Sequence, residues 1–237
     1  MEIIKRDLGP PDRNAILRAA NLYGVEVLIV EMATTSETSP IPTDIAVISK
    51  YTYNQLDSSR NQIRLLQVLP HANSSADQEV HCSLFAVSLD DEPNYEALSY
   101  VWGDPSNPAE ILLDGCRFFV TRNLAAALQA LQNSSTERVM WIDAICINQE
   151  SIAERNEQVQ KMRMIYQLAR QVVSWLGPAF EGSREAFGLL HQLNKQRIGD
   201  KSKLTRITTD PSCLSGWEGI IKLSDLPYWH RIVSILT

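Results

Sequence analysis

The chain has 237 residues and a formal net charge of −6, with 44% hydrophobic and 21% charged residues. This composition is typical of a soluble globular protein, and the length suits one large domain with a modest appendage. The acidic balance and the scattered basic residues exclude a general nucleic-acid or anionic-membrane footprint, so we expect no nucleic-acid and no membrane partner. The four cysteines lack the spacing of a zinc site. They predict free thiols in a reducing, cytoplasmic compartment and no metal.

The first 50 residues read as an N-terminal extension. The segment "NAILRAANLYG" predicts a helix that ends at Gly24, a favourable C-cap. The apolar segment "VEVLIVEM" then predicts a short buried strand, and the Ser/Thr/Pro-rich "ATTSETSPIPTD" predicts a linker. We therefore expect the main domain to begin near Tyr51.

Strands dominate the next part of the chain. The segments "QIRLLQVLP", "EVHCSLFAVSL" and "YEALSYVWG" each predict a strand, with the polar loop "HANSSADQ" between the first two. In "EILLDGCRFFV", the pair Asp114-Gly115 predicts a type I′ hairpin, because both turn positions need positive φ. Thr121 is the predicted N-cap of a helix over "RNLAAALQALQ", whose leucines at 124, 128 and 131 share one stripe.

An alternating pattern of strand and helix follows. "VMWID" and "QVVSWLG" predict buried strands on either side of the long helix "SIAERNEQVQKMRMIYQLAR". This order favours a parallel pair joined by a right-handed crossover. "SREAFGLLHQLNKQR" adds one more amphipathic helix. The predicted fold class is therefore α/β with mixed α+β edges, with hairpins early and a βαβ unit late.

Polar residues gather where "VMWID" leads into the long helix. Asp143 comes at the end of the strand, and Cys146 and Asn148 follow in the predicted loop. Ligands of parallel sheets usually meet the carboxyl ends of the strands, so this junction is a candidate site. An aspartate in this position also often ties loop amides together, and a cysteine between two isoleucines is more typical of an inert buried thiol.

The first turns of the long helix have a structural explanation of their own. Ser151 and Glu154 match the S-x-x-E capping box, and Glu157 and Lys161 match a favourable i,i+4 salt bridge. The predicted core stripe of this helix is Val159, Met162, Tyr166 and Ala169, with Ile165 and Leu168 on its flank. Composition and periodicity thus predict a fold class and no reaction.

Three long blocks of this sequence carry a family resemblance. "YEALSYVWGDP" at residues 95–105 resembles the first signature block of the fungal heterokaryon incompatibility (HET) domain. "ILLDG" with "VTRNLAAALQAL" is similar to the second block, and "WIDAICINQ" followed by "ERNEQVQKMRMIYQLARQVVSWLGP" is similar to the third. The blocks occur in the order of the family and cover roughly residues 51–180.

The resemblance implies a domain of filamentous fungi that triggers programmed cell death when genetically different cells fuse. It also implies a remote likeness to TIR domains, and hence a TIR-like parallel-sheet core with an added β-hairpin region and flanking helices. Some TIR domains cleave NAD at the nicotinamide-ribose bond using a glutamate, whereas others act as scaffolds that assemble. The resemblance therefore leaves an enzyme and a signalling module as alternatives.

The enzyme alternative is an NAD glycohydrolase, in which ionised carboxylates stabilise the oxocarbenium character of the ribose. NAD would be a substrate, and no cofactor is expected. Tyr100 and Trp102 are candidates for stacking on a nucleobase, with core packing as the competing explanation. The full candidate set is Asp143, Glu154 and Glu157 as catalytic residues, with Tyr100, Trp102, Asn148 and Arg155 as ligand-binding residues.

The second alternative, which we favour, is a non-enzymatic signalling module for nonself recognition that self-associates or docks on a partner signalling protein. In this description the charged residues at the start of the long helix, Glu154, Arg155 and Glu157, are interface or capping residues. The core residues would be Trp141, Tyr166 and Trp175.

The expected organisation is an extension over 1–50, a HET core over 51–180 and a helical C-terminal part over 181–237. Relatives continue past a YW-x-R element into a Gln-Glu pair, whereas here "LPYWHRIVSILT" starts that element, with His230 in its variable position, and stops at Thr237. Val-Ser is what a common splice-donor sequence encodes in frame, so Val233-Ser234 suggests intron read-through or a decayed gene. On that expectation the last part is truncated and the chain is an inactive product.

Overall fold

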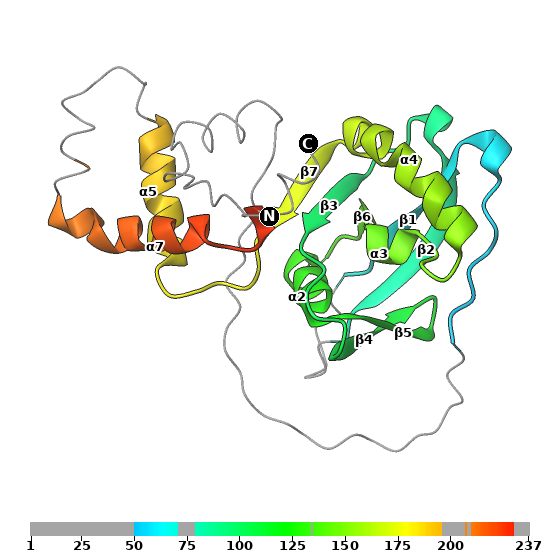
Figure 1. Cartoon of the computed structure of the whole chain (residues 1–237), viewed down its shortest axis with the longest axis horizontal. Helices are drawn as coiled ribbons and strands as arrows, with labels where there is room; N and C mark the ends of the chain where they lie inside the picture. Colours follow the sequence, from blue (N-terminus) through cyan, green and yellow to red (C-terminus); the bar gives the residue numbers. More distant parts are fainter. Residues whose placement is uncertain (1–49, 71–78, 134, 196–206, 208–209, 230–237) are drawn as a thin grey trace, which may run out of the picture.

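The computed structural model describes residues 50–70, 79–133, 135–195, 207 and 210–229 (Figure 1). The predicted N-terminal helix and strand, the loop "HANSSADQ" and the stretch from 230 to 237 lie outside these residues. Within the described ranges, no helix combines the length and the apolar character needed to cross a bilayer.

Seven strands form one mixed sheet in the order β5-β4-β2-β1-β6-β3-β7. The pairs β2/β4, β3/β6 and β3/β7 are parallel, and the pairs β1/β2, β1/β6 and β4/β5 are antiparallel. The α/β class, with a hairpin region and flanking helices, is therefore confirmed. The strands are β1 (Gln62–Val68), β2 (His81–Ser88), β3 (Glu96–Tyr100), β4 (Pro108–Leu113), β5 (Cys116–Thr121), β6 (Arg138–Trp141) and β7 (Gln171–Trp175).

The strands β6 and β7 run parallel, as predicted, but they are not neighbours. Strand β3 lies between them and pairs in parallel with both, so the crossover after β6 spans one intervening strand. All five residues of β3 are buried, as expected of a central parallel strand with both faces of the sheet covered. Sequence order could not reveal this insertion, because β3 comes before the hairpin and the βαβ unit in the chain.

The hairpin between β4 and β5 forms as predicted. Asp114 and Gly115 have φ of 50° and 74°, the left-handed values that a type I′ turn requires. Helix α2 (Arg122–Leu131) follows at once, and the hydroxyl of its N-cap, Thr121, accepts a hydrogen bond from the Leu124 N–H at 3.3 Å. The predicted leucine stripe of α2 is buried.

Two helices connect β6 to β7, and one of them was not predicted. The one-turn helix α3 (Asp143–Cys146) occupies what the sequence indicates as a loop. Helix α4 (Ile152–Leu168) begins at Ser151, whose hydroxyl accepts from the Glu154 N–H. That half of the predicted capping box is confirmed, and the Glu157–Lys161 salt bridge also forms, at 2.8 Å.

The buried face of α4 agrees with the predicted stripe except at its first position. Met162, Tyr166 and Ala169 pack against the core, and Ile165, predicted on the flank, is buried. Val159 is 52% exposed, whereas its neighbour Gln158 is buried. A glutamine is tolerated here because its Nε2 donates to the Gln62 carbonyl oxygen at 3.1 Å, which satisfies a polar group in the core. The apolar pattern was wrong at this position, because it assigned the inward place to the apolar neighbour.

A smaller helical part follows β7 and lies beside the sheet (Figure 1). It contains α5 (Ser183–Lys195) and α7 (Leu214–Ser224), which pack closely where Gly219 meets Gly182. A Cβ on Gly219 would lie 2.2 Å from the Gly182 carbonyl oxygen, so only glycine permits this approach. Among the described residues, the short 3₁₀ segments are η1 (Ser58–Arg60), η2 (Leu89–Asp91) and η3 (Pro211–Cys213).

The helical part is tied to the sheet by a buried hydroxyl group. The Tyr228 hydroxyl forms hydrogen bonds with two serine hydroxyls, Ser99 Oγ on β3 at 3.1 Å and Ser174 Oγ on β7 at 2.7 Å. Trp141 and Trp175 are buried in the main core, as predicted, and Tyr166 packs edge-on against Trp141. The described part of the C-terminal region is thus helical and in direct contact with the strands that carry the candidate site.

Candidate functional site

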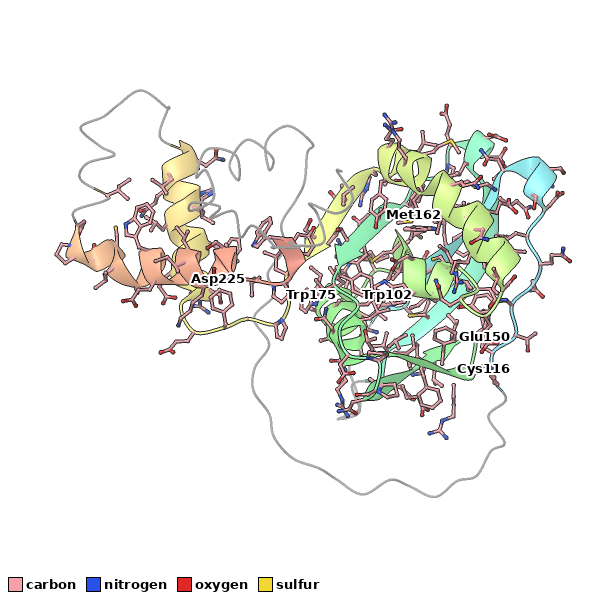
Figure 2. All side chains as sticks on the ribbon, viewed as in Figure 1. Trp102, Cys116, Glu150, Met162, Trp175 and Asp225 are labelled. Atoms are coloured by element: carbon pink, nitrogen blue, oxygen red, sulfur yellow. The ribbon has the colours of Figure 1, made fainter. Side chains whose placement is uncertain are left out.

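The predicted site lies at the carboxyl ends of β3, β6 and β7. Trp102 follows β3, and Trp175 ends β7 at the same edge of the sheet (Figure 2). Asp143 begins α3 directly after β6 and is 6% exposed. Trp102 Nε1 donates to Asp143 Oδ2 at 3.0 Å, and the Ala144 N–H donates to Oδ1 at 2.8 Å. The structure therefore brings together one predicted carboxylate and one predicted aromatic residue.

The two aromatic candidates differ in their surroundings. Trp102 is 42% exposed, so part of its indole surface faces solvent beside Asp143. Tyr100 is buried among the core residues at 1% exposure, which is the core-packing alternative considered for it. Of the two, only the Trp102 ring offers a surface on which a planar ligand can stack.

Glu154 is held in a separate cluster on the other side of the α3 turn. Its carboxylate forms a two-pronged ion pair with Arg64, at 2.5 Å to Nη1 and 3.1 Å to Nη2. It also accepts the Asn148 N–H at 2.8 Å, instead of returning to the Ser151 N–H as a full capping box would. The second half of the predicted box is therefore replaced by contacts to Arg64 and Asn148.

Arg64 is the centre of this cluster, and its side chain is only 4% exposed. Besides Glu154, it donates to the carbonyl oxygens of Cys146 at 3.1 Å and Asn54 at 2.5 Å, and its guanidinium stacks over the Tyr53 ring at 4.9 Å. We call Arg64, Glu154, Asn148 and Cys146 the Arg64 cluster. It joins the start of the domain, β1, α3 and α4, so its charges hold the fold together.

The remaining candidates lie further out. Glu157 accepts from Lys161 Nζ at 2.8 Å and from Ser58 Oγ at 2.7 Å, and these hydrogen bonds keep its pKa below the usual range. Arg155 is exposed, with Nη1 3.5 Å from the Gln149 carbonyl oxygen. Neither contact belongs to the pair formed by Asp143 and Trp102.

Cys146 is an inert thiol, as its apolar neighbours indicated. It is 1% exposed, its Sγ accepts from the Ile142 N–H at 3.3 Å, and burial raises its pKa to about 12. A thiol that stays protonated at neutral pH is a poor nucleophile. The carboxyl edge therefore offers carboxylates and an indole, but no activated sulfur.

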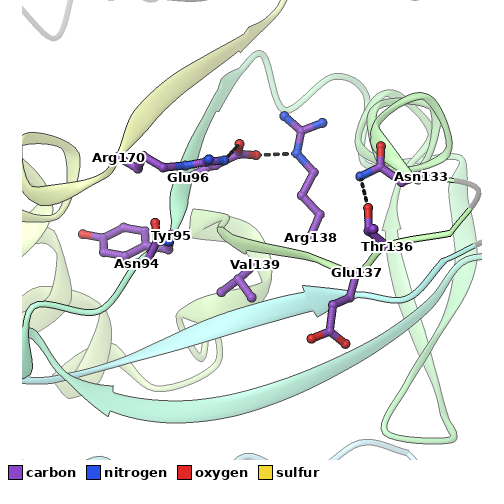
Figure 3. Close-up of a pocket in the computed structure, with 9 residues that line it drawn as sticks. All are labelled: Asn94, Tyr95, Glu96, Asn133, Thr136, Glu137, Arg138, Val139 and Arg170. Carbon is purple, nitrogen blue, oxygen red and sulfur yellow. Dashed lines mark hydrogen bonds and ion pairs between the residues drawn. The ribbon is translucent and has the colours of Figure 1, made fainter.

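Sequence reasoning missed two charged residues, Arg64 and Glu96. Each interrupts an apolar strand, in "QIRLLQV" and "YEALSY", and each is buried at 3% exposure. A charged residue inside an otherwise apolar strand was the available signal, because burial of a charge requires a partner. Glu96 lies at the opposite end of the parallel strands, beside a hollow of about 420 Å³ (Figure 3).

Comparisons with known proteins agree with the sequence blocks. The model of the family described as heterokaryon incompatibility protein (HET) matches residues 95–233, more than half of the chain. A curated relative, heterokaryon incompatibility protein 6, OR allele, of Neurospora crassa, is 35% identical over 164 residues. The match covers 62% of this chain and 24% of the relative, so the chain spans about a quarter of that protein's length.

No solved structure matches this chain, so the likeness to TIR domains stays a prediction. The family itself is established by the extent of the matching model and by the order of the three blocks within it. This chain belongs to the heterokaryon incompatibility (HET) family.

Proposed function

We propose that this chain acts in fungal heterokaryon incompatibility, as a cytoplasmic signalling module for nonself recognition and programmed cell death that works by self-association. Family membership supports the biological setting. The observation that carries the molecular role is the Arg64 cluster, in which the predicted catalytic Glu154 is bound on both oxygens by a buried guanidinium. A carboxylate engaged in this way is not free to face a substrate, which favours a non-enzymatic role for Glu154.

The proposal is tested by producing the chain in a filamentous fungus and scoring cell death. We expect the cells to lose viability when expression is induced. We also expect the average molecular mass of the purified chain, measured by light scattering, to increase with its concentration. A chain that stays monomeric across the concentration range and consumes NAD would contradict the signalling role.

An NAD glycohydrolase is the second candidate, and the pair formed by Trp102 and Asp143 favours it. This pair places an exposed indole face within hydrogen-bonding distance of a carboxylate at the carboxyl edge of parallel strands. The indole would stack on a ring of NAD, and the carboxylate would stabilise positive charge on the ribose. Asp143 is the catalytic candidate in this mechanism, and Glu154 would act only through the position of α3.

The enzyme alternative is tested by NAD consumption of the purified chain and of Asp143→Asn. The amide of Asp143→Asn retains an oxygen for the Trp102 N–H but removes the charge, so a catalytic role predicts a loss of about 100-fold or more. Asp104→Asn is the matched control, because Asp104 lies two residues beyond Trp102 and bonds only locally to Ser106 in the described contacts. Equal turnover by both variants would remove Asp143 from the mechanism.

A further inference from the structure

A second candidate site lies at the end of the sheet where the parallel strands begin. Glu96, Arg138 and Gln171 are the first residues of β3, β6 and β7, and Arg170 directly precedes β7. Because the three strands run in the same direction, these side chains meet at one edge. Glu96, Arg138 and Arg170 border the hollow of about 420 Å³ in Figure 3, which we call the amino-edge pocket.

Glu96 organises the charges of this pocket. Its carboxylate is 4% exposed and lies between the guanidinium groups of Arg138 and Arg170 (Figure 3). Arg138 donates through Nε to one carboxylate oxygen, and Arg170 donates through Nη2 to the other at 2.5 Å. Gln171 Nε2 adds a third hydrogen bond at 2.6 Å. The two arginines are thereby fixed at the same edge by one buried anion.

The charges are unevenly distributed within the amino-edge pocket. Its lining contains two arginines and two glutamates, Glu96 and Glu137. The Glu137 side chain points away from Arg138 and accepts a hydrogen bond from Gln67 (Figure 3). Beside Glu96, two guanidinium groups therefore share one carboxylate, which leaves a local excess of positive charge. The head of Arg170 is 60% exposed, so part of the excess charge lies at the mouth of the pocket.

Neutral polar groups complete the lining. Asn94, Asn133 and Thr136 border the same hollow, and Asn133 Nδ2 donates to Thr136 Oγ1 at 3.0 Å. A guanidinium carries five N–H donors in a planar fork, and Glu96 engages one N–H of each arginine. Arg138 Nη1 also donates to the Leu131 carbonyl oxygen at 3.5 Å, so the remaining N–H groups of the two arginines are the donors available to a ligand. The pocket is therefore lined by side-chain amides, a hydroxyl and two guanidinium groups. These donors, around a cavity of this size, suit a ligand with several acceptor oxygens.

We propose that the amino-edge pocket binds a phosphate group, carried by a small metabolite or free in solution. A phosphate presents three acceptor oxygens to Arg138, Arg170 and the amide side chains, whereas a carboxylate presents two. Glu96 acts as a positioning residue that holds both guanidinium groups toward the ligand. This proposal is independent of the signalling role and of NAD cleavage, because it concerns the opposite edge of the sheet.

The competing explanation is an ion-pair cluster that only fastens the strand ends. The two explanations differ in their response to Glu96→Gln. A purely structural cluster has no anion affinity for the substitution to change. A phosphate site gains affinity, because Glu96→Gln removes the negative charge that repels the ligand while the amide oxygen still accepts from an arginine.

The test is calorimetric titration of the full chain with inorganic phosphate and with AMP at low ionic strength. We expect both to bind to the unmodified chain, and Arg170→Gln to weaken binding by about tenfold or more, since it removes a charged fork at the mouth. Arg163→Gln is the matched control, because it removes the same charge from an exposed position of α4 outside the pocket. The phosphate affinity of Arg163→Gln should stay within about twofold of that of the unmodified chain.

Each outcome has a defined meaning. Tighter binding of AMP than of phosphate supports a nucleoside phosphate as the ligand, and equal binding supports the free anion. Stronger phosphate binding by Glu96→Gln supports an anion site, because a purely structural cluster has no anion affinity to change. Absence of phosphate and AMP binding up to about 10 mM, or equal affinities of Arg170→Gln and Arg163→Gln, would overturn the proposal.

Discussion

The two ends of the parallel strands each contain a buried charge, but the charges are compensated differently. At the carboxyl end, Arg64 meets one carboxylate, from Glu154, and two backbone carbonyl oxygens. At the amino end, Glu96 meets two arginines, one of which reaches solvent. The first cluster is balanced and closed, whereas in the second two arginines share one carboxylate beside an open hollow.

This difference separates two uses of a buried ion. A balanced, two-pronged pair offsets part of the desolvation cost of its charges, and removal of one partner is strongly destabilising. An unbalanced cluster at a hollow leaves donors directed toward a ligand. The buried ion at the carboxyl end is therefore the more closed of the two, although Trp102 at the same edge is 42% exposed, and the buried ion at the amino end is the more open.

The largest expected effect comes from breaking the balanced pair. Arg64→Met keeps an unbranched apolar side chain but removes the guanidinium that lies over the Tyr53 ring. It leaves the Glu154 carboxylate and two carbonyl oxygens without their cation. We expect a loss of about 3 kcal/mol in the free energy of unfolding, measured by urea denaturation. Glu154 is 14% exposed, so its partial contact with water limits the cost.

A double variant separates the ion pair from packing. Arg64→Met combined with Glu154→Met removes both charges, so it should unfold less easily than Arg64→Met alone. If the stability loss of the double variant equals the sum of the losses of Arg64→Met and Glu154→Met, the ion pair itself contributes little.

The next effect concerns the unbalanced cluster. Glu96→Gln deprives Arg138, whose side chain is 15% exposed, of its anion, whereas Arg170 can turn toward water. We expect a loss of about 2 kcal/mol, smaller than that of Arg64→Met. Glu110→Gln is the control, since Glu110 pairs with Arg117, which is 53% exposed, and should cost no more than about 0.5 kcal/mol. A loss for Glu96→Gln above that for Arg64→Met would reverse the comparison.

The pH dependence of stability tests how closed the carboxyl end is. Burial raises the pKa of Cys146 from 9.0 to about 12, so the unfolded chain releases this proton first as the pH rises. The stability contributed by the protonated thiol is full below pH 9 and is lost between about pH 9 and pH 12. At pH 10 the loss is about 1.4 kcal/mol.

Cys146→Ala removes this one titration and leaves that of Cys82, whose pKa is also raised to about 12. The variant should therefore lose less stability between pH 8 and pH 10 than the unmodified chain. Parallel stability curves would mean that the thiol is accessible to water and that the carboxyl end is open.

Much of the fold followed from local patterns. The Asp114-Gly115 turn, the Thr121 cap and the strands depend on neighbouring residues, and each forms where the sequence indicates. The place of β3 between β6 and β7 depends on pairing between distant segments, which no local pattern encodes. The predicted domain bounds at residues 50 and 180 stay predictions.

The candidate site was predictable only in part. Asp143 lies at the predicted edge because a polar residue after an apolar strand marks its carboxyl end. The pairing of Glu154 with Arg64 was not predictable, since 90 residues separate them. A capping box and an ion pair require the same glutamate, and only the tertiary structure decides between them.

The smallest expected effect on stability is that of Arg170→Gln, and it gives the most direct test of the open end. Arg170 is 60% exposed, so its ion pair with Glu96 is screened by solvent and should contribute less than about 1 kcal/mol. Millimolar phosphate should raise the melting temperature of the unmodified chain and of Arg163→Gln, but not that of Arg170→Gln. Arg170→Gln could instead lower the free energy of unfolding as much as Glu96→Gln does, with no stabilisation of any of these proteins by phosphate. That result would mean that Arg170 has a structural role only. Both ends of the sheet would then be closed, and the excess charge would serve only to hold three strand ends together.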